Sequence, residues 1–266
     1  MKKNILLGLI SILVIGLLAA CGTKDESADN GQAAEGDATE KVLKMGTSAD
    51  YAPFEYIDTA NGDEIIGFDI DIANAIADKL GYELEIVDSD FNGLIAALQS
   101  NKFDFVISGM TPTEERKKNV DFTDVYYVAN HMIVTTKDSG IESVEDFGGK
   151  VVGVQLGSIQ EELANELAET SDITVESRNR IPELIQELQI GRFDVAIIED
   201  TVAKGYLEKN DNLTGHTIEA DAEEAGSAIA FPKGSELTEE FNSALNELKE
   251  NGELEKLIIK WFGGEE

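Results

Sequence analysis

The 266-residue chain carries 53 acidic and 21 basic side chains, for a formal net charge of −32. Phosphate binding needs clustered Lys and Arg, so this balance argues against a nucleic-acid binder and against a protein held to anionic lipid by charge. Hydrophobic residues make up 42% of the chain, enough for a packed core in one large domain or two of ordinary size. A single cysteine and two separated histidines predict no disulfide, no metal site and no cofactor.

Residues 1–20 are predicted to be an export signal. Two lysines precede an apolar run, 5–20, that is shorter than the roughly 20 residues of a spanning helix. The run ends in Leu18-Ala19-Ala20-Cys21-Gly22. This end resembles the lipobox of bacterial lipoproteins, which implies cleavage before Cys21 and a lipid thioether on its sulfur. The alternative is an uncleaved membrane anchor with an incidental cysteine.

Residues 21–41 are predicted to be the lipidated Cys21 followed by a flexible acidic tether. The stretch 22–41 has no aromatic and no β-branched apolar residue, so it cannot bury enough surface to offset its ordering entropy. This arrangement would hold the folded body on the extracytoplasmic face of the cell membrane.

Short apolar runs alternate with helical patterns through the body of the chain. Strands are predicted at 42–46, 65–68 and 84–87, and helices over 72–80 and 94–98. Asp69 or Asp71 is expected to cap the first helix and Gly81 to end it. Strands that alternate with helices predict an α/β fold with a largely parallel sheet.

A stretch of the chain occurs twice. Residues 98–107 (LQSNKFDFVI) align without gaps to 188–197 (LQIGRFDVAI), and 44–48 align more weakly to 151–155. The repeat predicts two similar lobes, with chance similarity of two buried strand turns as the alternative. Ligands of open α/β sheets bind beyond the carboxyl ends of strands, so a ligand is expected between the lobes.

The two repeated strands lead into complementary charges. Arg116 follows the first strand, and Glu199 and Asp200 follow the second. Arg can hold a carboxylate with two parallel hydrogen bonds, and a carboxylate can accept from an ammonium group. The loop 156–160 opens a helix whose free N–H groups would add anion donors. This pattern predicts a site for a zwitterion.

Seven blocks occur in order along the body of the chain: 48–56 (SADYAPFEY), 67–72 (GFDIDI), 90–95 (DFNGLI), 108–117 (SGMTPTEERK), 120–123 (VDFT), 153–161 (GVQLGSIQE) and 260–263 (KWFG). Together they resemble the extracytoplasmic solute-binding proteins of ATP-driven importers for polar amino acids. The match covers roughly 42–263.

The resemblance implies a two-lobed periplasmic-binding-protein-like fold (type II). Each lobe would be a mainly parallel sheet flanked by helices, and two crossover hinge strands would join the lobes. Lobe 1 would comprise 42–129 plus 228–266, and lobe 2 would comprise 130–227. The implied function is a monomeric lipoprotein that captures a polar L-amino acid by hinge closure and delivers it to an ABC permease. Two alternatives are a dehydratase-like enzyme with Glu199 as acid, and a solute sensor that is not coupled to transport.

The same resemblance implies the ligand-binding residues. Arg116 would hold the carboxylate, assisted by Thr111 and by backbone at Ser158 and Ile159. Asp200 and the Gly109 carbonyl would take the ammonium, and Tyr51 and Phe91 would sandwich the side chain. Each has an alternative: Arg116 on a solvated helix face, Asp200 as a helix cap, and the two rings as ordinary core. Phe54, Phe68, Phe122 and Trp261 are interpreted as core, and His131 has no assigned role.

Specificity rests on fewer residues. Family members that bind cationic side chains carry Asp where this chain has Ser48. Glu199 could supply a counter-charge instead, or it could point into solvent. A second ligand carboxylate would be buried without a partner, which disfavours glutamate and aspartate unless Arg178 or Arg180 reaches the site. Arginine or lysine, glutamine, and cystine remain open.

Overall fold

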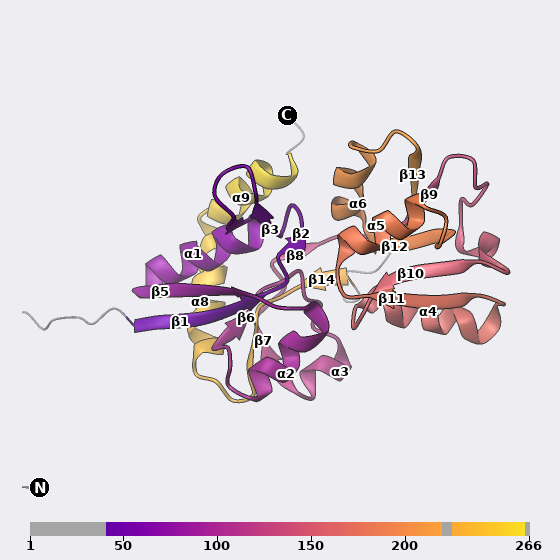
Figure 1. Ribbon diagram of the computed structural model, residues 1–266. Helices are drawn as coiled ribbons and strands as arrows, with labels where there is room; N and C mark the ends of the chain where they lie inside the picture. Colours follow the sequence, from indigo (N-terminus) through magenta and orange to yellow (C-terminus); the bar gives the residue numbers. More distant parts are fainter. Residues whose placement is uncertain (1–40, 220–224, 264–266) are drawn as a thin grey trace, which may run out of the picture. The chain divides into compact units, whose positions relative to one another are not determined.

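Hydrogen bonds between strands form two five-stranded sheets (Figure 1). The structure, a computed structural model, describes residues 41–219 and 225–263. All described residues belong to one compact unit. The predicted signal peptide, the lipid site at Cys21 and all of the tether except Lys41 lie outside the described residues, and Lys41 begins the first strand. No helix in the described part is both long and apolar enough to cross a bilayer.

The first sheet has the strand order β5-β1-β6-β15-β7. Its strands are β1 (Lys41–Thr47), β5 (Tyr82–Asp88), β6 (Phe105–Val106), β7 (Val120–Phe122) and β15 (Ala230–Pro232). β1 runs parallel to β5 and β6, and β15 runs antiparallel to β6 and β7. The parallel part is the predicted one, and the return of the C-terminal segment supplies the antiparallel strand.

Helices and a small sheet surround these strands. The helices are α1 (Phe68–Leu80), α2 (Leu94–Gln99), α3 (Glu114–Lys117), α8 (Leu237–Glu250) and α9 (Glu253–Phe262), with the short 3₁₀ turn η1 (Phe91–Gly93). The small sheet is β2 (Asp50–Tyr51), β3 (Glu55–Asp58) and β4 (Glu64–Ile66). α1 contacts β5, α8 and α9, so its apolar face is closed off by the C-terminal helices.

The start of α1 differs from the expectation. Phe68 begins the helix instead of ending a strand, and Gly67 is the N-cap. A β-carbon on Gly67 would lie 2.0 Å from the Phe54 carbonyl oxygen, so only glycine fits this junction. Asp69 is fully buried one residue into the helix and does not cap it, whereas Gly81 ends the helix in the left-handed conformation as predicted.

The second sheet has the strand order β11-β10-β12-β9-β13. Its strands are β9 (His131–Thr136), β10 (Val151–Gln155), β11 (Thr174–Arg178), β12 (Val195–Glu199) and β13 (Leu213–Ile218). Its helices are α4 (Ile159–Thr170), α5 (Ile181–Gln189) and α6 (Asp200–Leu207), with the 3₁₀ turn η2 (Val144–Phe147). β10 runs parallel to β11 and β12, and β9 runs antiparallel to β12 and β13.

The repeat seen in the sequence is a repeat in structure. The Asp104 carboxylate accepts a hydrogen bond from Lys44 N at 2.7 Å in the first sheet. The aligned Asp194 carboxylate accepts from Val151 N, aligned with Lys44, at 2.9 Å in the second. In both sheets, the residue after the repeated Phe therefore ties its turn to the neighbouring strand.

Two short paired segments connect the halves. β8 (Tyr127–Val128) pairs antiparallel with β14 (Gly226–Ser227), placing Tyr127 opposite Ser227. The chain leaves the elements of the first sheet through β8 and returns through β14. This pair confirms the predicted two crossover strands.

Candidate functional site

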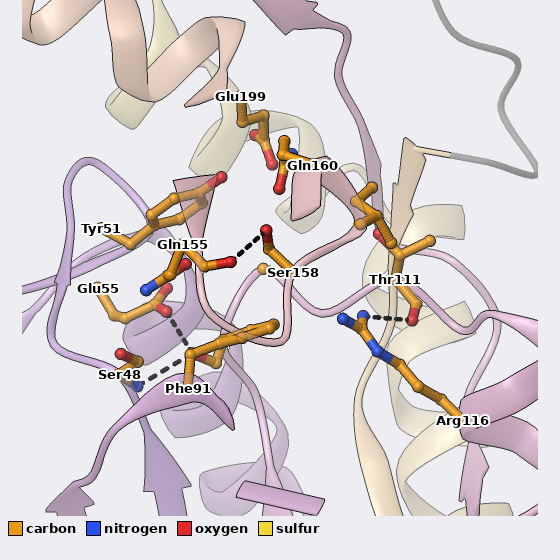
Figure 2. A pocket seen from close by; sticks show the side chains of 13 residues that line it. Ser48, Tyr51, Glu55, Phe91, Thr111, Arg116, Gln155, Ser158, Gln160 and Glu199 are labelled. Carbon is orange, nitrogen blue, oxygen red and sulfur yellow. Dashed lines mark hydrogen bonds between the residues drawn. The ribbon is translucent and has the colours of Figure 1, made fainter. Parts of the chain in front are cut away.

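The carboxyl ends of parallel strands from both sheets meet at one pocket (Figure 2). β1 and β6 lead to Ser48 and to the segment 108–111, and β10 and β12 lead to Gln155 and Glu199. The empty space within the pocket is about 360 Å³, counting space open to solvent. Its lining residues are Ser48, Tyr51, Glu55, Phe91, Ser108, Gly109, Thr111, Arg116, Gln155, Ser158, Ile159, Gln160 and Glu199.

The lining set contains every predicted ligand residue except Asp200. The Asp200 carboxylate accepts from Lys204 Nζ at 2.8 Å and from Asn130 N at 3.2 Å. Asp200 is the first residue of α6, and the adjacent Glu199 lines the pocket. The structure therefore directs Glu199 to the pocket and engages Asp200 elsewhere.

Arg116 lies in α3, whose first turn is capped by the Thr113 hydroxyl. Its guanidinium donates through Nη1 to the Thr111 carbonyl at 2.9 Å and through Nη2 to the Gly157 carbonyl at 2.8 Å. It lies 5.4 Å from the centroid of the Phe91 ring. Burial lowers the pKa of Arg116 to about 10, so the guanidinium keeps its charge at neutral pH. The two bonds occupy two of its five N–H donors, leaving others for an anion.

The start of α4 adds backbone donors to the same region. The Ser158 hydroxyl donates to the Gln155 carbonyl at 2.7 Å and accepts from Glu161 N at 3.1 Å. Ser158 is the N-cap, and Ile159 and Gln160 begin the helix at the pocket wall. The first N–H groups of a helix lack partners within the helix and favour a negative charge. Together with Arg116, they make this region suited to a carboxylate.

Glu199 is a carboxyl group almost shut off from water, with 6% of its surface exposed. The Thr201 hydroxyl donates to its Oε1 at 2.8 Å, and the Tyr51 hydroxyl also bonds it. Burial raises the pKa of Glu199 to about 8, and the hydrogen bonds from Thr201 and Tyr51 offset only part of that rise. A cation in the pocket would favour the ionised form.

A second buried carboxyl, Glu55, was not predicted. The Ser108 hydroxyl donates to Glu55 Oε1 at 2.6 Å. Behind it, Asp69 Oδ2 accepts from Gly109 N at 2.7 Å and from the Tyr126 hydroxyl at 2.9 Å. The other two carboxyl oxygens, Glu55 Oε2 and Asp69 Oδ1, are buried and have no hydrogen-bond partner in the described part of the chain.

Glu55 and Asp69 affect each other's ionisation. Burial raises the pKa of both groups, that of Asp69 to about 6 and that of Glu55 well above its ordinary range, and the negative charge of Asp69 adds to the rise for Glu55. A cation beside Glu55 would favour its ionised form.

Three further lining residues were not assigned by sequence reasoning. Gln155 Nε2 donates to the Asn179 carbonyl at 3.1 Å, and Ser108 bonds Glu55. Gln160 Nε2 lies 3.2 Å from His131 Nδ1, so His131 contacts a pocket residue. Glutamines give no local pattern that separates a pocket wall from a solvated surface. In residues 41–219 and 225–263, no cluster of His, Cys, Asp or Glu side chains is arranged to hold a metal ion.

Several known proteins are similar to this chain over nearly its whole length. The family described as bacterial extracellular solute-binding proteins, family 3, matches residues 43–264. The chain is 57% identical over 266 residues to the arginine-binding extracellular protein ArtP of Bacillus subtilis (strain 168), covering 100% of both chains. It is 31% identical over 268 residues to the L-cystine-binding protein TcyA of the same strain, covering 98% of each.

A solved structure gives a comparable match. An ancestral arginine-binding protein bound to arginine superposes with a TM-score of 0.79 at 42% sequence identity, covering 84% of this chain and 99% of that one. The named ligands of these relatives differ, and the pocket of this chain distinguishes between them.

Proposed function

The chain belongs to the bacterial extracellular solute-binding proteins of family 3, and we propose that it captures L-arginine. It is an extracytoplasmic substrate-binding protein of an amino-acid importer. The observation that carries the choice of ligand is the charge pattern of the pocket. Two carboxyl groups, Glu55 and Glu199, line it opposite one basic lining residue, Arg116.

The proposed pose pairs each charge of the ligand with one of these groups. Arg116 and the start of α4 hold the carboxylate, because both offer donors at that end of the pocket. Glu199, rather than Asp200, takes the α-ammonium. Figure 2 shows Ser48 and Glu55 at the end away from Arg116, where the ligand side chain would lie. A guanidinium there would meet the Glu55 carboxylate.

This charge balance disfavours glutamine, cystine and glutamate. Glutamine brings no cation for Glu55, and cystine brings its second ammonium only together with a second carboxylate. A second carboxylate, as in glutamate, would face Glu55 without a cation. Arg178 bonds Glu176 and Glu187, and Arg180 bonds aspartates outside the lining set, so neither supplies that cation. The 57% identity to an arginine-binding protein supports the same conclusion.

A thermal-shift panel with the common amino acids, ornithine, citrulline and cystine tests the proposal. Free ligand at 100 times Kd should stabilise the protein by about 2.7 kcal/mol, which is a shift of a few degrees. We expect arginine to give the largest shift at equal concentration and Glu55→Gln to remove its advantage over citrulline, a neutral analogue. A larger shift from glutamine or cystine would contradict the choice of arginine.

We also propose that Cys21 carries the lipid anchor and that the monomer delivers its ligand to an ABC permease. The basis is the lipobox-like sequence before Cys21 and the importer context of the family. Cys21→Ser should release the protein from the membrane fraction and abolish incorporation of labelled fatty acid. Labelled fatty acid on the variant would contradict the assignment. The relatives compared are binding proteins by name, and we propose no catalysed reaction.

A further inference from the structure

A row of three residues from the second half of the molecule reaches across to three aspartates beside the pocket. Asn179 Nδ2 donates to Asp90 Oδ2 at 3.0 Å. Arg180 donates to Asp90 at 2.9 Å through Nε and to both oxygens of Asp88, at 2.8 and 3.2 Å. Ile181 N donates to Asp50 Oδ2 at 2.6 Å. We refer to residues 179–181 with Asp50, Asp88 and Asp90 as the clasp.

The aspartates of the clasp lie close together around one guanidinium. Arg180 Nη1 also lies 3.5 Å from Asp50 Oδ1. The side chain of Arg180 is 24% exposed and that of Asp50 is 8% exposed, so these charges are only partly screened by water. Separation of the halves would leave three carboxylates without this cation, and their mutual repulsion would disfavour that state.

One member of the clasp continues into the pocket. The Ser48 hydroxyl donates to Asp50 Oδ1 at 2.8 Å, and Ser48 lines the pocket at its side-chain end. A hydroxyl has one hydrogen, so this bond leaves only lone pairs of Ser48 Oγ for a ligand. Ser48 Oγ therefore offers the ligand only an acceptor as long as its hydroxyl hydrogen is bonded to Asp50. Burial raises the pKa of Asp50, while the bonds from Ile181 and Ser48 favour its ionised form.

We propose that Arg180 and Asp50 are positioning residues that couple closure of the lobes to selection of the ligand side chain. Arg180 stabilises the closed arrangement for any ligand. Asp50 fixes Ser48 as an acceptor and so favours a side chain rich in N–H donors, such as guanidinium. The inference rests on the proposed function, because it takes the ligand side chain to lie beside Ser48.

The two roles predict different effects on two ligands. Arg180→Met keeps an unbranched stem and removes the guanidinium, so it should raise the Kd for arginine and the Kd for citrulline by the same factor, about tenfold. It should also reduce the salt dependence of Kd between low salt and about 1 M, where the Debye length falls to about 3 Å. Small-angle scattering of the ligand-free variant should show a larger radius of gyration.

Asp50→Asn tests the second role at nearly constant shape. The Asn amide can still accept from Ile181 N, but its NH₂ group would donate to Ser48 Oγ and turn the hydroxyl hydrogen toward the pocket. The Kd for arginine should therefore rise about tenfold more than the Kd for citrulline, because the citrulline carbonyl can accept that hydrogen. The ratio of the two Kd values is the readout, because a general loss of stability would change both alike.

Arg178→Met is the matched control. Arg178 lies two residues before Arg180 and also pairs with acids, Glu176 and Glu187, but both belong to its own half. Its loss should leave the radius of gyration and the salt dependence unchanged. An Arg180→Met protein that behaves like this control, or an unchanged Kd ratio in Asp50→Asn, would overturn the proposal. Failure of the wild-type protein to bind arginine would instead contradict the proposed function, and the scattering comparison would still test the clasp.

Discussion

The guanidinium of Arg116 bonds the carbonyl oxygen of Gly157 at 2.8 Å, although the two residues belong to elements of different sheets. Gly157 lies in the loop between β10 and α4, directly before the Ser158 cap. Arg116 therefore holds the donor-rich start of α4 against the segment that follows β6. The group proposed to bind the ligand carboxylate also joins the two walls of its site.

Replacing Arg116 with alanine should weaken arginine binding strongly. Loss of one partner of a buried charge pair costs about 2–5 kcal/mol, so affinity should fall at least thirtyfold. Isothermal titration calorimetry measures the affinity, and circular dichroism checks that the variant folds. Lys117→Ala is the control, because Lys117 is the next residue of α3 and pairs only with the exposed Glu114. Its effect should stay within about 0.5 kcal/mol, and equal losses in both variants would contradict the assignment.

Binding should release protons from Glu199. The pKa of Glu199 is about 8 in the ligand-free protein, so the carboxyl is largely protonated at pH 7. An ammonium beside it favours the ionised form and expels the proton. Affinity should therefore rise as the pH increases from about 5 to about 8 and level off above.

Calorimetry in buffers of different ionisation heat counts these protons. Arginine should release more than citrulline, because only arginine also brings a cation to Glu55, whose pKa is raised by burial and by the charge of Asp69. Glu199→Gln should lower the count for both ligands, and Glu55→Gln should lower it for arginine alone. Heats that do not depend on the buffer would contradict both assignments.

The ligand-free protein should lose stability as the pH rises from about 5 to about 8. The pKa values of Asp69 and Glu199 are raised in the folded state, to about 6 and about 8, so their contribution is fully present only below the unfolded-state pKa near 4 and declines up to these values. Carboxyls with a lowered pKa, such as Asp121 and Asp124, make stability rise with pH instead. That rise is complete below this pH range, so it does not oppose the loss.

Urea unfolding at several pH values measures how the free energy of unfolding changes with pH. The loss should be on the order of a few kcal/mol, and Glu199→Gln should flatten the part between about pH 6 and 8. A wild-type stability that rises through this range would contradict the burial of these carboxyls as the cause.

The sequence predicted the pocket well where a motif coincided with a strand end. Thr111, Arg116 and Ser158 follow buried apolar strands, and parallel strands bring their carboxyl ends together. The resemblance implied Asp200 for the ammonium, and Glu199 is the one that lines the pocket. The apolar run 195–198 is buried on both faces, so its alternation does not show which following residue turns to the pocket.

Glu55 was missed for a related reason. It lies in β3, a four-residue strand whose neighbours include the core residue Phe54, and its carboxyl meets Asp69 from α1. A strand this short has no readable period, and a pair of acids from separate elements leaves no local pattern. The same limit applies to the clasp, where residues 179–181 meet aspartates about 90 or more positions earlier.

The sequence repeat gives both sheets an equivalent contact between a glycine and a phenylalanine. A β-carbon on Gly153 would lie 2.3 Å from Phe193 Cδ2, and one on Gly46 would lie 2.3 Å from Phe103 Cδ2. The two glycines and the two phenylalanines occupy aligned positions of the repeat. Each glycine thus leaves space for the ring that follows the repeated turn, which explains why the weaker echo of 44–48 in 151–155 preserves the glycine.

Gly153→Ala should therefore destabilise the protein by about 1–3 kcal/mol, because the ring of Phe193 has to move in a packed core. Thermal unfolding should show a fall of several degrees, and Gly46→Ala should behave alike against Phe103. Phe193→Leu combined with Gly153→Ala should cost less than the sum of the two single changes, since the smaller side chain relieves the clash.

Gly205→Ala is the control, because Gly205 lies within α6 with no atom within 4 Å of an added β-carbon, and alanine there should raise stability by about 0.5–1 kcal/mol. Equal melting of Gly153→Ala and wild type would show that the ring does not need the space the glycine leaves.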